Sequence, residues 1–174
     1  TISMLNRAFI IKMAKRTGKF SQKELYNICA YVDPQMPYGA CATRLSDGSM
    51  FIRIGANMRH KNCPLQKITA GFALHELSHL YNRDNLEIKN LTHNLLPWDP
   101  MYLEKTQKIL AIKTQQEIRA DDFAIKYTTI AEKLEFLEEL NAIKILHLDN
   151  DKQTQGYHPP IDSRIDKVIA SLKN

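Results

Sequence analysis

The spacing of apolar residues along the chain predicts a mainly helical protein. In five segments the apolar side chains recur every three or four positions, as they do on one face of an α-helix. The predicted helices are Met4–Arg16, Leu65–Tyr81, Met101–Tyr127 (one long helix or two consecutive ones), Ile130–Leu146 and Ile161–Lys173. Gly18 is placed to end the first helix, and Pro159-Pro160 to introduce the last.

Shorter runs predict a small amount of β-structure between the first two of these helices. Ala40–Leu45 and Met50–Ile54 have the composition of strands, and the Asp47-Gly48 pair between them is typical of a β-hairpin. Leu25–Val32 is also rich enough in Tyr, Ile and Val to be a strand. However, it follows Ser21–Glu24, which resembles a capping box and would begin a short helix, so both interpretations stay open.

The segment 82–100 is polar and contains two prolines, so we expect an irregular connection in which Trp98 acts as a packing anchor. The whole pattern predicts a single α+β domain over residues 1–174, mainly helical with a small sheet or hairpin. Within it, residues 1–20 would carry an amphipathic helix and residues 155–174 a terminal segment and helix.

Composition and charge narrow the classes of function. With 174 residues, 44% hydrophobic and 25% charged, the chain is typical of a globular protein. Its net charge of +5 comes from Lys and Arg spread along the sequence, without the dense basic face of a nucleic-acid-binding protein. No apolar stretch approaches the roughly 20 residues that a membrane helix needs. The basic N-terminal helix either docks on the core, as we expect, or contacts a membrane surface peripherally.

The three cysteines, Cys29, Cys41 and Cys63, form neither a disulfide framework nor a metal-finger pattern. We expect each to be a small buried hydrophobe. Because a secretory pattern is also missing at the N-terminus, a reducing, cytoplasmic compartment is the expected location.

The chemistry is concentrated in His75-Glu76-Leu77-Ser78-His79, an HExxH motif inside a predicted helix. Residues four apart lie on the same face of a helix, so both imidazoles can reach one metal ion. Zn²⁺ prefers nitrogen and oxygen ligands in tetrahedral geometry, and it lowers the pKa of a bound water to about 7. Glu76 is offset from the two histidines and would act as the general base that takes the proton of this water.

A third ligand must complete such a site. A histidine six residues after the second one, following a glycine, is excluded because Asn82 and Asn85 occupy those positions. Glu117 on the downstream helix is the predicted ligand. Asp121, one turn further along the same face, would accept a hydrogen bond from a ligand histidine and fix its orientation.

HExxH followed by Glu117-x-x-Ala120-Asp121 resembles the gluzincins, and especially the HtpX-type and CAAX-prenyl-endopeptidase family. Further matching segments cover the chain from Pro37 to Leu172. They are Gly39-Ala40-Cys41-Ala42, Asp47-Gly48 and Phe51-Ile52-Arg53-Ile54 before the motif, Leu74 directly before it, and His158-Pro159-Pro160 with Arg164-Ile165 near the end.

The resemblance implies a zinc-dependent endopeptidase that acts on protein or peptide substrates and holds one Zn²⁺ per chain. It also implies a substrate-binding edge strand at Met50–Ile54, with Phe51, Ile52 and Arg53, while Arg164 would bind a carboxylate or brace the last helix. Tyr157 and His158 are the candidate catalytic donors to the oxyanion. Many family members carry membrane helices and a longer span between the second histidine and the glutamate. We therefore expect a soluble, minimal catalytic domain.

Two other functions remain open. One is a regulatory peptidase of a single partner protein, like the ImmA/IrrE type, which also combines HExxH with a glutamate-bearing helix. The other is a catalytically silent interaction domain that binds a metal only for stability. Glu76 favours an enzyme, because a purely structural metal site needs no general base.

Overall fold

The computed structural model of the chain describes residues 2–36, 38–56, 67–146 and 158–174. Helices dominate it, and a small sheet of three strands lies beside them, so the predicted α+β class with mainly helical content is confirmed. The elements in chain order are α1 (Ile2–Thr17), α2 (Gln22–Tyr26), β1 (Ile28–Asp33), β2 (Ala40–Arg44), β3 (Met50–Gly55), α3 (Ala70–Asn82), α4 (Asp84–Thr92), α5 (Tyr102–Tyr127), α6 (Ile130–Leu146) and α7 (Ile161–Leu172).

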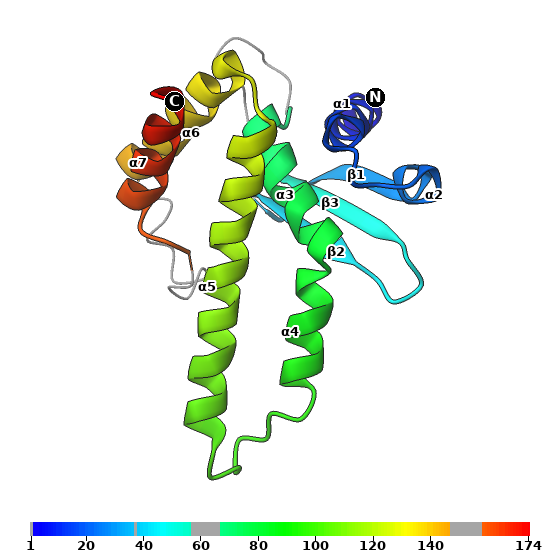
Figure 1. Ribbon diagram of the computed structural model, residues 1–174. Coiled ribbons are helices and arrows are strands. Elements are labelled where there is room, and N and C mark those ends of the chain that lie inside the picture. Colours follow the sequence, from blue (N-terminus) through cyan, green and yellow to red (C-terminus); the bar gives the residue numbers. More distant parts are fainter. Residues whose placement is uncertain (1, 37, 57–66, 147–157) are drawn as a thin grey trace.

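Helix α3 is the centre of the arrangement (Figure 1). It packs against α1 and the sheet on one side, and against α5 and α6 on the other. Ten of its residues are buried, which explains why this segment is the most apolar helix in the chain. α7 packs on α6, and α4 continues from α3 alongside the lower half of α5, so that α4 and α5 form a two-helix stalk that projects away from the sheet (Figure 1).

The N-terminal part follows the sequence pattern closely. α1 buries Ile10, Met13 and Ala14 in the core, as expected for a helix that docks on its own domain. Ser21 and Glu24 form the capping box in both directions, and this bond pair begins the short helix α2. A strand, β1, starts two residues after that helix ends, so each of the two open interpretations of residues 25–32 is correct for part of the segment.

The sheet has the strand order β1-β3-β2, with β3 parallel to β1 and antiparallel to β2. The predicted hairpin between β2 and β3 is confirmed, and Gly48 adopts the positive φ of +92° that its turn requires. The prediction of β3 as the edge strand is wrong, because β1 pairs with its other side. Met50, Ile52 and Ile54 are fully buried on this central strand.

The segment 82–100 differs from the expected irregular connection, because it contains the nine-residue helix α4. Arg83 adopts a left-handed conformation, with φ +57°, and this single residue separates α4 from α3. Ile88 and Leu91 lie three positions apart, as on one face of a helix, but the polar and proline-containing composition of the segment concealed this spacing. Trp98 is no packing anchor: it lies at the turn between α4 and α5 and is 78% exposed.

Two further details depart from expectation. α3 begins at Ala70 rather than Leu65, after three non-helical residues, and positions 65 and 66 lie outside the described residues. Cys29 is exposed rather than buried, Cys41 is half-buried, and Cys63 lies outside the described part of the chain. None of the helices in the described ranges combines the length and the apolarity that crossing a lipid bilayer requires.

Candidate metal centre

The two histidines of α3 and the glutamate of α5 converge on one point. His75 Nε2 lies 3.2 Å from Glu117 Oε2, and His79 Nε2 lies 3.3 Å from Glu117 Oε1. The two Nε2 atoms are 3.1 Å apart. Each residue offers one ligand atom to a group that spans no more than 4.8 Å, so these three side chains are able to hold a metal ion.

The hydrogen bonds behind the imidazoles determine what this point can bind. His75 Nδ1 lies 2.9 Å from Asp121 Oδ1, and His79 Nδ1 lies 2.7 Å from Asp84 Oδ2. Because an ionised carboxylate only accepts, both Nδ1 atoms are assigned as N–H donors. In the neutral tautomers, the lone pairs of both Nε2 atoms then face Glu117 and each other. Such an arrangement is repulsive unless a proton or a cation lies between them.

Glu117 supports the same interpretation. Its Oε2 atom is buried and makes no hydrogen bond of good geometry to any described residue, although His75 Nε2 and His158 Nδ1 are within 3.2 Å. A buried, ionised oxygen without a hydrogen bond destabilises the folded protein unless a nearby cation compensates its charge. Two imidazole nitrogens and one carboxylate oxygen form a donor set that zinc favours.

Asp121 is itself held in place by α7. Arg164 donates two hydrogen bonds to it, from Nε to Oδ2 at 2.7 Å and from Nη2 to Oδ1 at 2.9 Å. The geometry predicted for Glu117 and Asp121, side by side on one helix face, is confirmed. Arg164 is nine-tenths buried in this pair, so it braces α7 against the site and its fork is not open to a substrate carboxylate.

Asp84 is a residue of the site that the sequence interpretation missed. Arg119 donates a short hydrogen bond to its Oδ1 atom, and Gln116 donates to its backbone oxygen at 3.3 Å. Asp84 follows His79 by five positions, outside the regular spacing of a helix face. It reaches the imidazole because Arg83 turns the chain between α3 and α4. The only signal for this contact in the sequence is the proximity of the acid to HExxH.

The charges around the centre leave room for a dication. Among the described residues, four carboxylates and two guanidiniums meet there; when all six are ionised and the imidazoles are neutral, two negative charges remain. The six groups are Glu76, Asp84, Glu117, Asp121, Arg119 and Arg164. A divalent cation or two protonated histidines would balance this charge.

The pKa values follow from this excess of negative charge. Burial lowers the pKa of His75, but its hydrogen bond to Asp121 and the adjacent carboxylate of Glu117 outweigh this effect and raise the pKa to about 9. In the same way, Asp84 and Glu117 raise the pKa of His79 to about 10 against the effect of burial. Burial opposes ionisation of Glu117, yet the three histidines His158, His75 and His79 hold its pKa far below the usual range. The site therefore binds positive charge strongly, whether as protons or as a metal.

Glu76 lies on α3 between the two histidines and is not one of the three converging ligands. It is buried, and burial raises its pKa, an effect that the charges on His75 and His79 partly offset. A carboxylate with a raised pKa accepts a proton more readily at neutral pH, which suits a general base.

Of the two predicted donors to the oxyanion, the structure describes only His158. His158 lies at the start of the α7 segment, with Nδ1 3.0 Å from Glu117 Oε2, so it joins the centre. Tyr157 lies outside the described residues.

The residues predicted to bind substrate lie on β3. Ile52 is fully buried, and Arg53 on the same strand donates to Asp33 Oδ2 at 3.3 Å. Together with Phe51 they occupy the central strand, which has no free edge for a substrate backbone.

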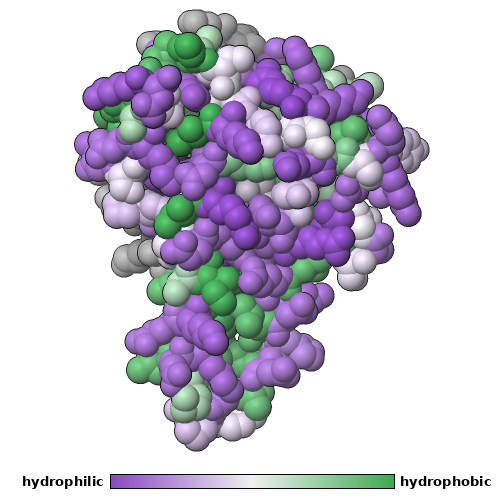
Figure 2. Space-filling model, in the orientation of Figure 1, coloured by the Kyte–Doolittle hydropathy of each residue, from purple (hydrophilic) through white to green (hydrophobic). Residues whose placement is uncertain are grey.

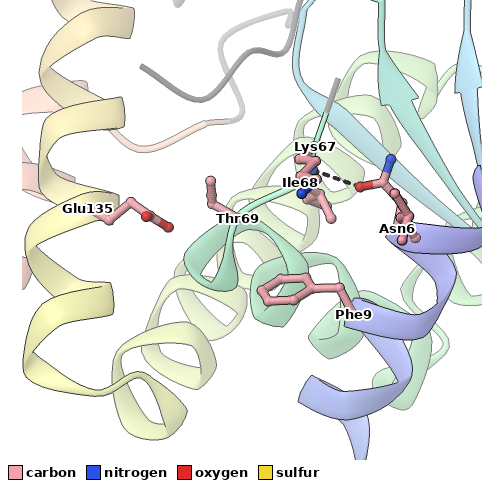
Figure 3. A pocket seen from close by; sticks show the side chains of 7 residues that line it. Asn6, Phe9, Lys67, Ile68, Thr69 and Glu135 are labelled. Atoms are coloured by element: carbon pink, nitrogen blue, oxygen red, sulfur yellow. Dashed lines mark hydrogen bonds between the residues drawn. The ribbon is translucent and has the colours of Figure 1, made fainter. Parts of the chain in front are cut away.

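A separate hollow of about 420 Å³ lies between α1, the segment before α3 and α6 (Figure 3). Leu5, Phe9 and Glu135 are among its lining residues, and Asn6 Oδ1 accepts a hydrogen bond from the backbone of Ile68 at 3.0 Å on its wall. None of the converging ligands lines it.

Comparison with known proteins returns no relative from which a function could be transferred. No family model matches the chain, and neither a curated protein nor a solved structure resembles it significantly.

Proposed function

We propose that this protein is a zinc-dependent endopeptidase of the gluzincin type. The observation that carries the proposal is the convergence of His75, His79 and Glu117 on one point, with the carboxyl group of Glu76 on the same helix as the histidines. The chain holds its ligands on two packed helices, α3 and α5, which is the rigid support that a catalytic metal needs.

Each protein group has a specific role in the proposed reaction. When bound, zinc would polarise the scissile carbonyl and acidify a water molecule. Glu76 accepts the proton of the attacking water and passes it to the leaving amine. Asp121 and Asp84 keep the two imidazoles in the tautomer that points Nε2 at the centre. His158, whose side chain is about one-third exposed, is the candidate donor to the oxyanion.

The proposed binding edge for an extended substrate is β2 instead of β3. In an antiparallel strand, alternate residues direct their backbone groups to opposite sides. The N–H of Arg44 points away from β3, because it donates to Asn85 Oδ1 at 2.9 Å. Ala40 and Ala42 lie four and two positions before Arg44, so their backbone N–H and C=O groups also point away from β3. They face the open side of the sheet, where a peptide strand could pair. α3 packs against β2, which favours this edge.

The resemblance to the HtpX-type family gains support from the C-terminal segment, residues 158–172. His158 and Arg164, two residues of the matching C-terminal segment, contact Glu117 and Asp121 respectively. Contact with the candidate metal centre is what we expect of a segment that takes part in catalysis. A regulatory peptidase of one partner protein would use the same residues, and its difference would lie in the range of substrates. A catalytically silent domain would not need a buried glutamate with a raised pKa, such as Glu76, beside the site.

Cleavage of an unfolded protein such as casein tests the proposal. The wild type and Glu76→Gln are compared after removal of metal with a chelator and after zinc is added back. We expect activity only in the zinc-restored wild type, because losing a general base costs about 10²–10⁴-fold in rate. Glu104→Gln, at an exposed position on the stalk, is the matched control and should cleave like the wild type. Undiminished cleavage by Glu76→Gln would refute the assigned mechanism.

A further inference from the structure

The end of the stalk carries a concentration of exposed apolar side chains. Trp98 is 78% exposed and Leu103 is 70% exposed, and four other large apolar residues within a few positions are also exposed. The apolar tip, as we call this cluster, consists of Leu91, Leu96, Trp98, Met101, Tyr102 and Leu103. Figure 2 shows apolar surface along the narrow part of the molecule, which Figure 1 identifies as α4 and α5.

Single exposed apolar residues are common, but a cluster at the far end of a projecting hairpin is unusual for a protein surrounded only by water. The hairpin has too little interior to bury these side chains. Ile109 already lies buried on the stalk, and α4 is only nine residues long. The apolar side chains of the tip therefore point outward, where they can be buried only in an apolar environment outside the protein.

The charged residues beside the tip leave a small positive excess: between residues 89 and 108 there are three lysines and two acids, a net charge of +1. Lys89 on α4 and Lys108 on α5 are exposed and lie along the stalk behind the apolar residues. Asp99, at the turn, is neutralised by an ion pair with Lys105, and Glu104 is the other acid at this level. The chain as a whole has a formal net charge of +5, so the electrostatic attraction is towards a negatively charged surface.

We infer that the apolar tip inserts into the interfacial layer of a lipid membrane with anionic headgroups. Trp and Tyr are the residues that favour the boundary between headgroups and acyl chains, and Leu and Met extend further into the apolar layer. Lysines behind them can reach the phosphates with their long side chains. This surface replaces α1 as the membrane contact, because Ile10, Met13 and Ala14 of α1 are buried in the core.

The inference also gives the candidate metal centre a position. Leu103 and Glu117 lie on the same helix, 14 residues apart, and the rise of an α-helix separates them by about 21 Å. With the tip in the membrane and α5 upright, the centre would stand about that far above the lipid surface. Resting on the proposed function, this position implies that the substrates are segments that emerge from the membrane or lie close to it.

Trp98 provides a direct test, because it is the only tryptophan in the chain. Vesicles of phosphatidylcholine with phosphatidylserine are added to the whole 174-residue protein, and the tryptophan emission and vesicle flotation are measured. We expect a blue shift, protection from a water-soluble quencher, and weaker binding at high salt or with phosphatidylcholine alone. Glu76→Gln should behave like the wild type, since the membrane contact does not depend on catalysis.

A pair of double variants makes the test specific. Met101→Ser with Leu103→Ser keeps the fluorescent probe and should lower vesicle binding by at least about tenfold, because two apolar contacts are lost. Leu134→Ser with Ile145→Ser replaces two exposed apolar residues of α6 and should bind normally. All four side chains are exposed, so neither variant should impair folding, which circular dichroism checks.

Three outcomes would overturn the inference: unchanged Trp98 emission at saturating lipid, equal loss of binding in the two double variants, or a blue shift that follows protein concentration without lipid. The last result would identify the tip as a contact between two copies of the chain. Equal binding to phosphatidylcholine alone would contradict the part assigned to the lysines.

Discussion

At the scale of single residues, the arrangement depends on carboxylates that orient the imidazoles. Asp121 accepts a hydrogen bond from His75, and Arg164 fixes Asp121 in turn. Asp84 does the same for His79 with the help of Arg119. Sequence spacing indicated Asp121, because it lies one helical turn after Glu117. It could not indicate Asp84, because a left-handed residue sets the direction of that side chain.

The first prediction concerns Asp121. Asp121→Asn keeps the shape but removes the charge that stabilises the N–H tautomer of His75, so zinc affinity should fall by about 10–100-fold. Competition with a chromophoric chelator measures the change. The neighbouring Asp122→Asn is the control, because Asp122 is exposed and pairs with Lys167 at 2.8 Å. Equal affinities of the two variants would show that Asp121 has no special role.

The second prediction concerns Glu139, a carboxyl group away from the metal centre. Burial raises its pKa to about 8, and a contact with Thr69 offsets only part of this effect. The unfolded chain releases this proton near the ordinary glutamate pKa of 4.5, whereas the folded chain retains it up to about pH 8. The group therefore lowers the free energy of unfolding progressively as pH rises between these values.

Glu139→Gln should remove this pH dependence and stabilise the protein at pH 8 by on the order of 1–2 kcal/mol. At pH 4.5, the ordinary glutamate pKa, the variant and the wild type should differ little. Urea denaturation at the two pH values provides the measurement. A variant that is less stable than the wild type at the higher pH would mean that the ionised carboxylate has a favourable partner.

At the scale of elements, α3 must fit closely under α6. A Cβ atom at Gly71 would lie 2.4 Å from Cγ of Phe136, which is itself fully buried. This contact explains a glycine within an otherwise strong helix, where alanine would normally be preferred by about 1 kcal/mol.

Gly71→Ala should therefore lower the free energy of unfolding by about 1–3 kcal/mol, despite the better helix propensity of alanine, because the core becomes overpacked. Adding Phe136→Leu should recover part of the loss by making room for the methyl group. Thermal and urea unfolding of the single and double variants measure both effects. A Gly71→Ala protein at least as stable as the wild type would show that the two helices move apart without cost.

The elements also show where sequence patterns succeed and fail. Strong local signals predicted α1, α5, α6, α7 and the β2–β3 hairpin, because apolar periodicity, caps and turn residues act over short distances. The central position of β3 could not be predicted, since it depends on pairing with a strand about 20 residues earlier. The helix α4 was missed because polar residues and two prolines in the segment concealed the spacing of Ile88 and Leu91.

At the scale of the whole molecule, the chain brings together candidate metal ligands that are 42 residues apart in sequence, from His75 to Glu117. The packing of α3 on α5 provides this proximity, while α7 closes the assembly through Arg164. The stalk extends from the same two helical segments that border the centre, so one helix, α5, carries both a proposed metal ligand and part of the apolar tip. The proposed catalytic site and the proposed membrane contact are thus connected by a single rigid element.

The most direct test of the central claim is the zinc content of the purified protein, measured by elemental analysis after reconstitution and removal of free metal. The wild type and Glu76→Gln should each retain about one zinc per chain, because Glu76 is not a ligand, whereas Glu117→Ala should lose most of it. Failure of the wild type to retain zinc, or equal retention by Glu117→Ala, would contradict the assignment of His75, His79 and Glu117 as a metal centre.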